Sequence, residues 1–200
     1  KYVGYEFTAN LEEELDDVPA AIDALEELLL EDEQRVATYE AQEALLTKAE
    51  RWDDLVQLYE RWLDANAGDV VSLKHKLATV AVKHLDDPYR ALDQWREALA
   101  INGNHEPSIS AVEQLMIRDD FRGAAAELLE PVFLARMEWP RVVSALEARL
   151  TVTDDLVGRK EIHRRLGQIH EDYLEDLDGA LERYAALFRE EPRDRDAWDT

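Results

Sequence analysis

The sequence contains no cysteine, and it has only seven glycines and six prolines among its 200 residues. Without cysteine the chain has no disulfide, no thiolate ligand for zinc and no cysteine nucleophile. Glycine and proline disfavour helix interiors, so their scarcity favours long helices joined by short connections. No apolar run approaches the roughly 20 residues that a membrane-spanning helix needs. The start of the chain lacks the basic and then apolar pattern of a signal peptide, which predicts a cytoplasmic protein.

Basic side chains are also scarce, because 23 Lys and Arg stand against 46 Asp and Glu, for a formal net charge of −23. Proteins that bind nucleic acid contact its phosphates with Lys and Arg, so this balance argues against a nucleic-acid partner. Residues 1–50 hold three basic side chains against fifteen acidic ones, so about half of the excess lies in the first quarter. Two interpretations stay open: a solvated helical face, or an acidic docking surface for a basic partner.

Motifs for catalysis and ligand binding are missing as well. The glycines do not occur at the spacing of a phosphate-binding loop, and none of the four serines lies in a Gly-x-Ser-x-Gly pattern. His170 and Glu171 begin like the zinc-binding helix His-Glu-x-x-His, but the second histidine is absent. We therefore expect no metal, no cofactor and no catalytic residue, and we predict that the chain is not an enzyme.

Three segments of the sequence repeat one another. Residues 85–95 match residues 174–184 at a shift of 89, and residues 15–22 match the first of these at a shift of 70. At a shift of 87, Trp52 falls on Trp139. Apolar residues inside the copies recur at steps of three and four, which is the spacing of one face of a helix. Each copy is therefore predicted to form a pair of helices.

The last copy resembles the tetratricopeptide (TPR) signature. The residues that carry the resemblance are Leu166-Gly167, His170, Ala180, Tyr184, Leu187 and Pro192. The copy departs from the signature in having one extra residue between its helices, in His170 for an aromatic residue and in Leu187 for a small one. The chain as a whole looks like the degenerate TPR arrays of large bacterial proteins, particularly myxobacterial ones. The resemblance implies an all-α, right-handed α-solenoid of antiparallel helix hairpins with about 11–12 helices, each packed on its neighbours.

The patterns predict where these helices lie. We expect them over 1–15, 17–31, 33–49, 52–66, 69–85, 87–101, 105–117, 119–136, 138–152, 155–174 and 176–190, with a last one from about 194. We expect residues 1–200 to form a single TPR-like solenoid and to be a segment of a longer array. Its first run of hairpins covers 1–101, an irregular insert covers 102–137, and a second run covers 138–200. A break is expected near Pro131, because proline inside a helix costs about 3 kcal/mol.

The resemblance also implies a binding groove lined by the first helix of each hairpin. Carried over by position, the groove residues are Tyr2, Tyr5, Glu12 and Glu13 in the first copy, His75, Thr79 and Lys83 in the middle copy, and Arg164, Gln168, Glu171 and Asp172 in the last. TPR modules that clamp a terminal carboxylate use several basic residues there, and the basic residues of this groove are too few and too scattered to support a clamp.

The groove supports several kinds of partner. The main prediction is a non-catalytic scaffold or adaptor that binds another protein or peptide. An alternative is an acidic chaperone-like module, in which the acidic and aromatic residues of the first copy hold a Lys- or Arg-bearing segment. A remote alternative is a non-catalytic subunit or domain of an enzyme complex. Self-association is a further possibility, because the ends of a solenoid expose apolar faces.

Overall fold

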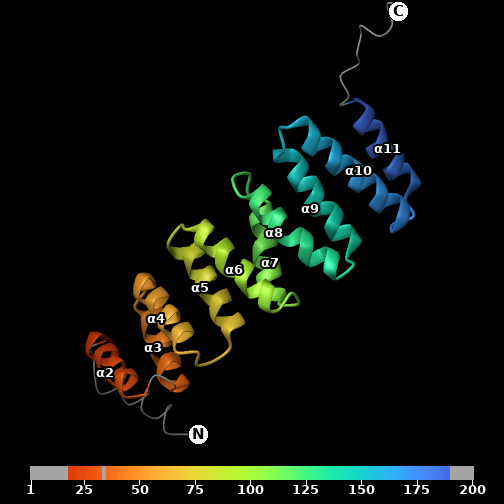
Figure 1. Ribbon diagram of the computed structural model, residues 1–200. Coiled ribbons are helices and arrows are strands. Elements are labelled where there is room, and N and C mark those ends of the chain that lie inside the picture. Colours follow the sequence, from red (N-terminus) through yellow and green to blue (C-terminus); the bar gives the residue numbers. More distant parts are fainter. Residues whose placement is uncertain (1–17, 33–34, 190–200) are drawn as a thin grey trace, which may run out of the picture. The chain divides into compact units, whose positions relative to one another are not determined.

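The computed structural model describes residues 18–32 and 35–189 of the protein. These residues form ten helices and no strand (Figure 1). The helices are α2 (Val18–Glu31), α3 (Val36–Lys48), α4 (Trp52–Asp64), α5 (Val70–His84), α6 (Pro88–Ile101), α7 (Glu106–Met116), α8 (Arg122–Ala135), α9 (Trp139–Val152), α10 (Leu156–Asp172) and α11 (Leu177–Arg189). The predicted all-α class is confirmed. The helices expected over 1–15 and from 194 lie outside the described residues.

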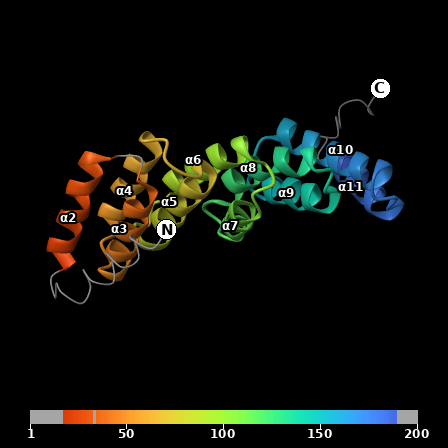
Figure 2. The same cartoon turned by 90° about the horizontal axis from the view of Figure 1, so that it is seen from below.

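The chain divides into two compact units, Lys1–Ser108 and Ile109–Thr200. In the first unit, each helix from α2 to α6 packs mainly on the helix before it and the helix after it (Figures 1 and 2). In the second unit, α8, α9, α10 and α11 follow the same rule. Packing between consecutive helices alone is the pattern of a helical repeat, in which each hairpin buries its apolar face against its neighbours.

Aspartates begin several of these helices. The carboxylate of Asp87 accepts a hydrogen bond of 3.0 Å from the backbone N–H of Arg90, and Pro88 takes the first helical position of α6. Asp176 accepts one of 3.0 Å from the N–H of Gly179 at the start of α11. A carboxylate in this position satisfies a backbone donor that the helix itself leaves unpaired. Because Asp87 and Asp176 occupy the same position of the repeat, the two copies begin their second helices in the same way.

The loops between the helices repeat as well. Glu50 and Met137, which align at a shift of 87, have φ angles of 53° and 56°. The next residue of each loop donates the same hydrogen bond, from Arg51 to the carbonyl of Leu46 and from Glu138 to that of Phe133. A helix commonly ends in this way: one residue adopts a left-handed conformation, and the N–H of the next residue bonds the carbonyl five residues earlier. The sequence repeat therefore corresponds to a repeat of backbone geometry.

The second pair of loops behaves in the same way. Asp86 and Glu175, which align at a shift of 89, have φ angles of 49° and 52°. The N–H of Asp87 bonds the carbonyl of Ala81 at 2.9 Å, and that of Asp176 bonds the carbonyl of His170 at 2.9 Å. Loops with the same conformation set the same angle between the flanking helices, so each hairpin places its helix faces alike.

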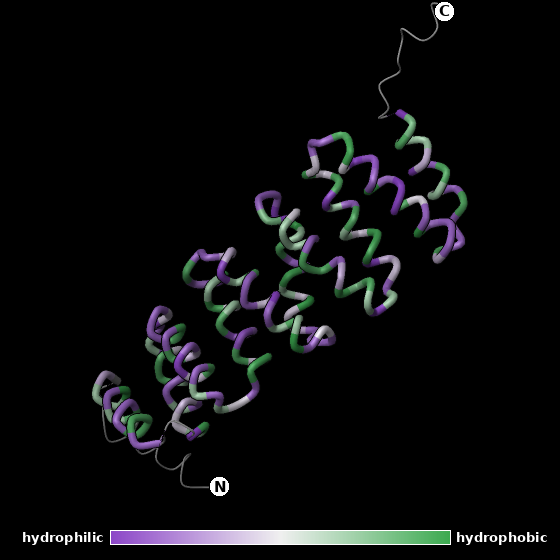
Figure 3. The backbone as a smooth tube through the Cα atoms, viewed as in Figure 1, coloured by the Kyte–Doolittle hydropathy of each residue, from purple (hydrophilic) through white to green (hydrophobic). Residues whose placement is uncertain are grey.

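A small residue faces a large one in the hairpin of α10 and α11. Gly167 on α10 lies so close to Tyr184 on α11 that a Cβ atom would be 2.5 Å from the ring carbon Cε1. The aligned residues of the first unit, Ala78 and Trp95, are 0% and 2% exposed. Figure 3 shows that hydrophobic and hydrophilic residues alternate along the helices. The Leu-Gly position of the TPR signature thus serves here to bring two helices together.

The break expected near Pro131 is absent, because α8 runs without interruption from Arg122 to Ala135. Residues 102–137 accordingly hold two regular helices, α7 and α8, rather than an irregular insert. Pro131 has no backbone N–H, so the carbonyl of Glu127, four residues earlier, lacks its helical hydrogen bond. Glu127 is exposed, so water can satisfy that carbonyl, while buried Leu129 and Phe133 hold the helix on either side of the proline.

Candidate functional site: an exposed polar stripe on α10

The predicted groove residues of the last copy lie together on one face of α10. Arg164, Gln168, Glu171 and Asp172 are all exposed, and Glu161 extends the same stripe toward the helix start. Positions three, four and seven apart share a helix face, so the stripe runs along most of the helix. The opposite face of α10 carries buried residues such as Ile162 and Leu166 and packs on α9 and α11.

Two contacts order this stripe. The guanidinium of Arg164 pairs with the carboxylate of Glu161 one turn earlier. The hydroxyl of Tyr184 on α11 donates a hydrogen bond of 3.0 Å to Glu171, and this contact contributes to a raised pKa of Tyr184, after the larger effect of desolvation. The stripe therefore presents one positive charge among acidic groups, with the amide of Gln168 between them. Such a surface offers both donors and acceptors to a polar or charged segment.

The middle-copy residues behave differently. His75 is half-buried, and the indole N–H of Trp95 donates to its Nδ1 at 3.2 Å. Thr79 is also half-buried and donates from its hydroxyl to the carbonyl of His75 at 2.8 Å. Lys83 is exposed. Two of the three residues predicted to line the groove in this copy are therefore engaged in packing, which leaves Lys83 as the exposed member.

His75 belongs to a polar cluster within the first unit. The hydroxyl of Ser108, which is 0% exposed, lies 3.2 Å from Nδ1 of His75 and 2.8 Å from Nδ1 of His105. Because an indole nitrogen only donates, the Trp95 contact requires the Nδ1 of His75 to be unprotonated. Burial lowers the pKa of His75, and the nearby His105 and Lys83 lower it further. The cluster therefore holds His75 as a neutral acceptor.

The first-copy residues Tyr2, Tyr5, Glu12 and Glu13 lie outside the described residues. Within residues 18–32 and 35–189, no three His, Cys, Asp or Glu side chains are placed to hold a metal ion. His170, which stands at the aromatic position of the signature, contacts the carboxylate of Asp176 through Nδ1 at 2.9 Å. In the same part of the chain, no helix has the length and apolar character that crossing a bilayer requires.

Sequence reasoning missed one surface on the last described helix, α11. Leu177, Leu181 and Phe188 are 71%, 68% and 70% exposed there. The repeat itself held the signal, because Leu181 and Phe188 align at a shift of 89 with Leu92 and Leu99 in α6. Those two leucines are 2% and 6% exposed. The same repeat positions are therefore buried in α6 and exposed in α11.

Comparison with known proteins gives a likeness of fold. No protein-family model matches the chain, and no curated protein matches it. Among solved structures, the chain is similar to YrrB, described as a TPR protein with an unusual peptide-binding site, at 19% identity and a TM-score of 0.39, over 96% of this chain and 86% of that one. It is also similar to MamA, at 15% identity and a TM-score of 0.40, over 99% and 94% of the two chains.

The repeat type is decided by the chain's own geometry. Antiparallel hairpins recur with the same loop conformations, and a small residue faces a large one at the positions of the TPR signature. The chain is an all-α helical-repeat protein whose hairpins resemble the TPR repeat. In such a protein, the face of a hairpin that no neighbouring hairpin covers is the surface left for partners, and on α10 that face is the polar stripe.

Proposed function

We propose that this protein is a non-catalytic interaction scaffold in the cytoplasm, and that the polar stripe on α10 is its partner-binding surface. The observation that carries the proposal is the exposure of the whole stripe beside a fully packed opposite face. Arg164 and Gln168 supply donors, while Glu171 and Asp172 supply acceptors. A partner segment with both acidic and basic groups would find a counterpart for each along the helix.

A capture experiment with matched variants tests this proposal. The intact protein is immobilised, and bound proteins are collected from a lysate of its source organism and identified by mass spectrometry. The test variant carries Gln168→Ala, Glu171→Gln and Asp172→Asn. The control variant carries Glu127→Gln on α8, an exposed glutamate on another helix of the same unit. We expect one partner to be captured by the wild type and the control and to be lost with the test variant. Equal capture by all three proteins would refute the assignment of α10.

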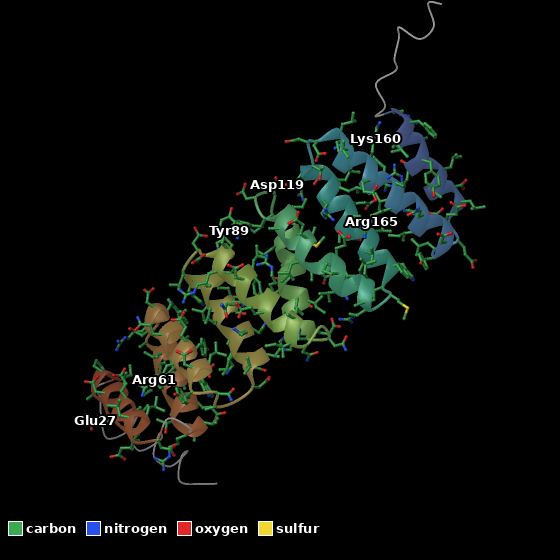
Figure 4. The ribbon with its side chains drawn as sticks, viewed as in Figure 1. Glu27, Arg61, Tyr89, Asp119, Lys160 and Arg165 are labelled. Atoms are coloured by element: carbon green, nitrogen blue, oxygen red, sulfur yellow. The ribbon has the colours of Figure 1, made fainter. Side chains whose placement is uncertain are left out.

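An acidic chaperone-like module is the second candidate, and the described part of α2 favours it. This helix carries Asp23, Glu26, Glu27 and Glu31 and no Lys or Arg (Glu27 is labelled in Figure 4). A basic protein would be held there mainly by charge, so its binding would weaken steeply as salt rises. A fluorescent oligolysine peptide, titrated at low and at high salt, separates the candidates. Salt-sensitive binding that Glu27→Gln with Glu31→Gln abolishes would support the second, and no binding at low salt would exclude it.

A further inference from the structure

One side of α11 carries a stripe of apolar residues. Leu177, Leu181 and Phe188 are each about 70% exposed, and their spacing of four and seven places them on one face of the helix. The half-buried Tyr184 borders the same stripe. Ala180, in contrast, is 4% exposed and lies on the side that packs on α10. We call the three exposed residues the α11 stripe.

A comparison within the chain shows what this face is suited to. The aligned residues of α6, Leu92 and Leu99, are almost fully buried. The same repeat position is therefore used for helix packing in the first unit, whereas no described helix covers it on α11. Contiguous exposed apolar residues on a folded protein mark an interaction surface. The shape and polarity that match it are those of another amphipathic helix.

Charges beside the stripe indicate which helix that is. Asp178 and Glu182 lie in the first half of α11 and Arg189 is its last residue, and all three are exposed. At 100° per residue they fall on one flank of the stripe. When two copies of α11 pack antiparallel, the charged flank of one helix lies beside the charged flank of the other. The first half of each helix then lies beside the last half of its partner. Arg189 of each copy then lies opposite Asp178 of the other, so the two ends of this flank are complementary to each other.

We propose that two copies of this chain associate through their α11 stripes, with the two helices antiparallel. The scaffold role does not require this contact, so the inference goes beyond the proposed function. Parallel packing would bring the charged flank against the side of the partner helix that α10 occupies, which leaves Arg189 without an acidic neighbour. The antiparallel arrangement repeats each contact twice about a two-fold axis, as in most homodimers.

The size and charge of the interface set how the dimer behaves. A single helix of 13 residues buries less than the roughly 1,200 Å² of total area that stable complexes reach, so the dimer is weak and forms with rising concentration. Each copy also carries a net charge of −23, which repels the other copy at long range. Salt screens this repulsion and leaves apolar contact intact. Association is therefore expected to strengthen from low to moderate salt.

Sedimentation velocity of the intact protein over a range of concentrations tests the dimer. We expect a shift from monomer toward dimer for the wild type, and about a tenfold weaker association for Leu181→Glu. Leu30→Glu is the matched control, because Leu30 on α2 is 74% exposed but lies in the other unit. Circular dichroism verifies that both variants are folded. A wild type that stays monomeric at every concentration, or equal effects of the two substitutions, would overturn the proposal.

Charge reversal tests the antiparallel pairing separately. Arg189→Glu places acidic groups at both ends of the flank, and Asp178→Arg places basic groups at both ends. Each variant alone should associate severalfold more weakly than the wild type, whereas an equimolar mixture restores both pairs and should associate about as well as the wild type. A mixture that associates no better than the separate variants would rule out the antiparallel register.

Discussion

At the scale of single residues, the close contacts of this protein occur where the repeat needs them. Gly167 allows α10 and α11 to approach, and a Cβ atom there would lie 2.5 Å from the ring of Tyr184. His75 occupies a position that the TPR resemblance assigns to a groove, yet it accepts a hydrogen bond from Trp95 and packs against His105. At this repeat position the side chain therefore contacts the protein itself.

Gly167→Ala is expected to destabilise the second unit. The added methyl group must displace the Tyr184 ring, and overpacking of this kind costs about 1–3 kcal/mol, more than the helix gains from alanine. Gly103→Ala is the control, because the nearest atom to its Cβ would be 3.7 Å away. Urea unfolding of both variants measures the difference. A Gly167→Ala protein as stable as Gly103→Ala would show that the two helices are not in this close contact.

The pKa of His75 predicts how stability depends on pH. Its pKa is lowered in the folded protein from an ordinary value of 6.5, so the unfolded chain binds the proton more readily. The contribution of neutral His75 is therefore complete above pH 6.5 and is lost as the pH falls through the lowered folded pKa. Between pH 7 and 5.5 we expect the free energy of unfolding to decrease.

Substitution isolates the contribution of His75. His75→Gln keeps an acceptor for Trp95 and has no proton to gain, so its unfolding free energy should fall less over the same pH range. His105→Gln should reduce the pH dependence less than His75→Gln does, because His105 is only one of the causes that lower the pKa of His75. Chemical denaturation at several pH values measures all three proteins. If the wild type and His75→Gln show the same pH dependence, His75 is not held neutral by this cluster.

At the scale of helices and loops, the repeat appears in the backbone as clearly as in the sequence. The loop residues Glu50, Asp86, Met137 and Glu175 all adopt left-handed conformations. A stacked pair of rings also occurs at the same place in both copies. The ring centroids of Trp52 and His84 are 3.6 Å apart, and those of Trp139 and Tyr173 are 3.7 Å apart. Each stack joins the start of one helix to the end of the next, so the hairpins are held at matching points.

Glycine at the left-handed positions should stabilise the protein. A side chain in this conformation costs about 1 kcal/mol that glycine does not, so Glu50→Gly and Glu175→Gly are each expected to raise the free energy of unfolding. The same substitution at Glu40, an exposed site inside α3, should lower it by about 1 kcal/mol. Thermal unfolding compares the three variants. Losses of similar size at all three sites would contradict the assigned loop conformation.

A buried carboxylate links three helices of the second unit. Glu130 on α8 is 6% exposed and pairs with Arg149 on α9 and with Arg165 on α10, the latter at 2.5 Å (Arg165 is labelled in Figure 4). Removing one partner from a buried ion pair leaves the others uncompensated. Because both arginines are about one-third exposed, we expect Glu130→Ala to cost about 2 kcal/mol rather than more.

The neighbouring Glu127 provides the control for this prediction. It lies on the same helix but is exposed, so Glu127→Ala should change the free energy of unfolding by less than about 0.5 kcal/mol. Denaturant unfolding followed by circular dichroism gives both values. If the two substitutions have equal effects, the Glu130 pairs do not stabilise the contact among α8, α9 and α10.

At the scale of the whole molecule, the sequence repeat predicted more of the fold than of the site. Helix periodicity and capping aspartates located the ten described helices, because these signals are local. The uninterrupted α8 was not predicted, since the cost of Pro131 depends on whether Glu127 lies next to water. The four groove residues predicted on α10 are exposed, and their role in binding stays a prediction. The packing of His75 depends on Trp95, Ser108 and His105, which only the fold brings together.

Hydrogen–deuterium exchange of the protein with its captured partner tests the central claim most directly. If the polar stripe is the binding surface, the partner should slow exchange in α10 (Leu156–Asp172) and leave α8 (Arg122–Ala135) unchanged. The same protection should be absent in the variant with Gln168→Ala, Glu171→Gln and Asp172→Asn. Protection confined to other helices, with α10 unchanged on binding, would contradict the account.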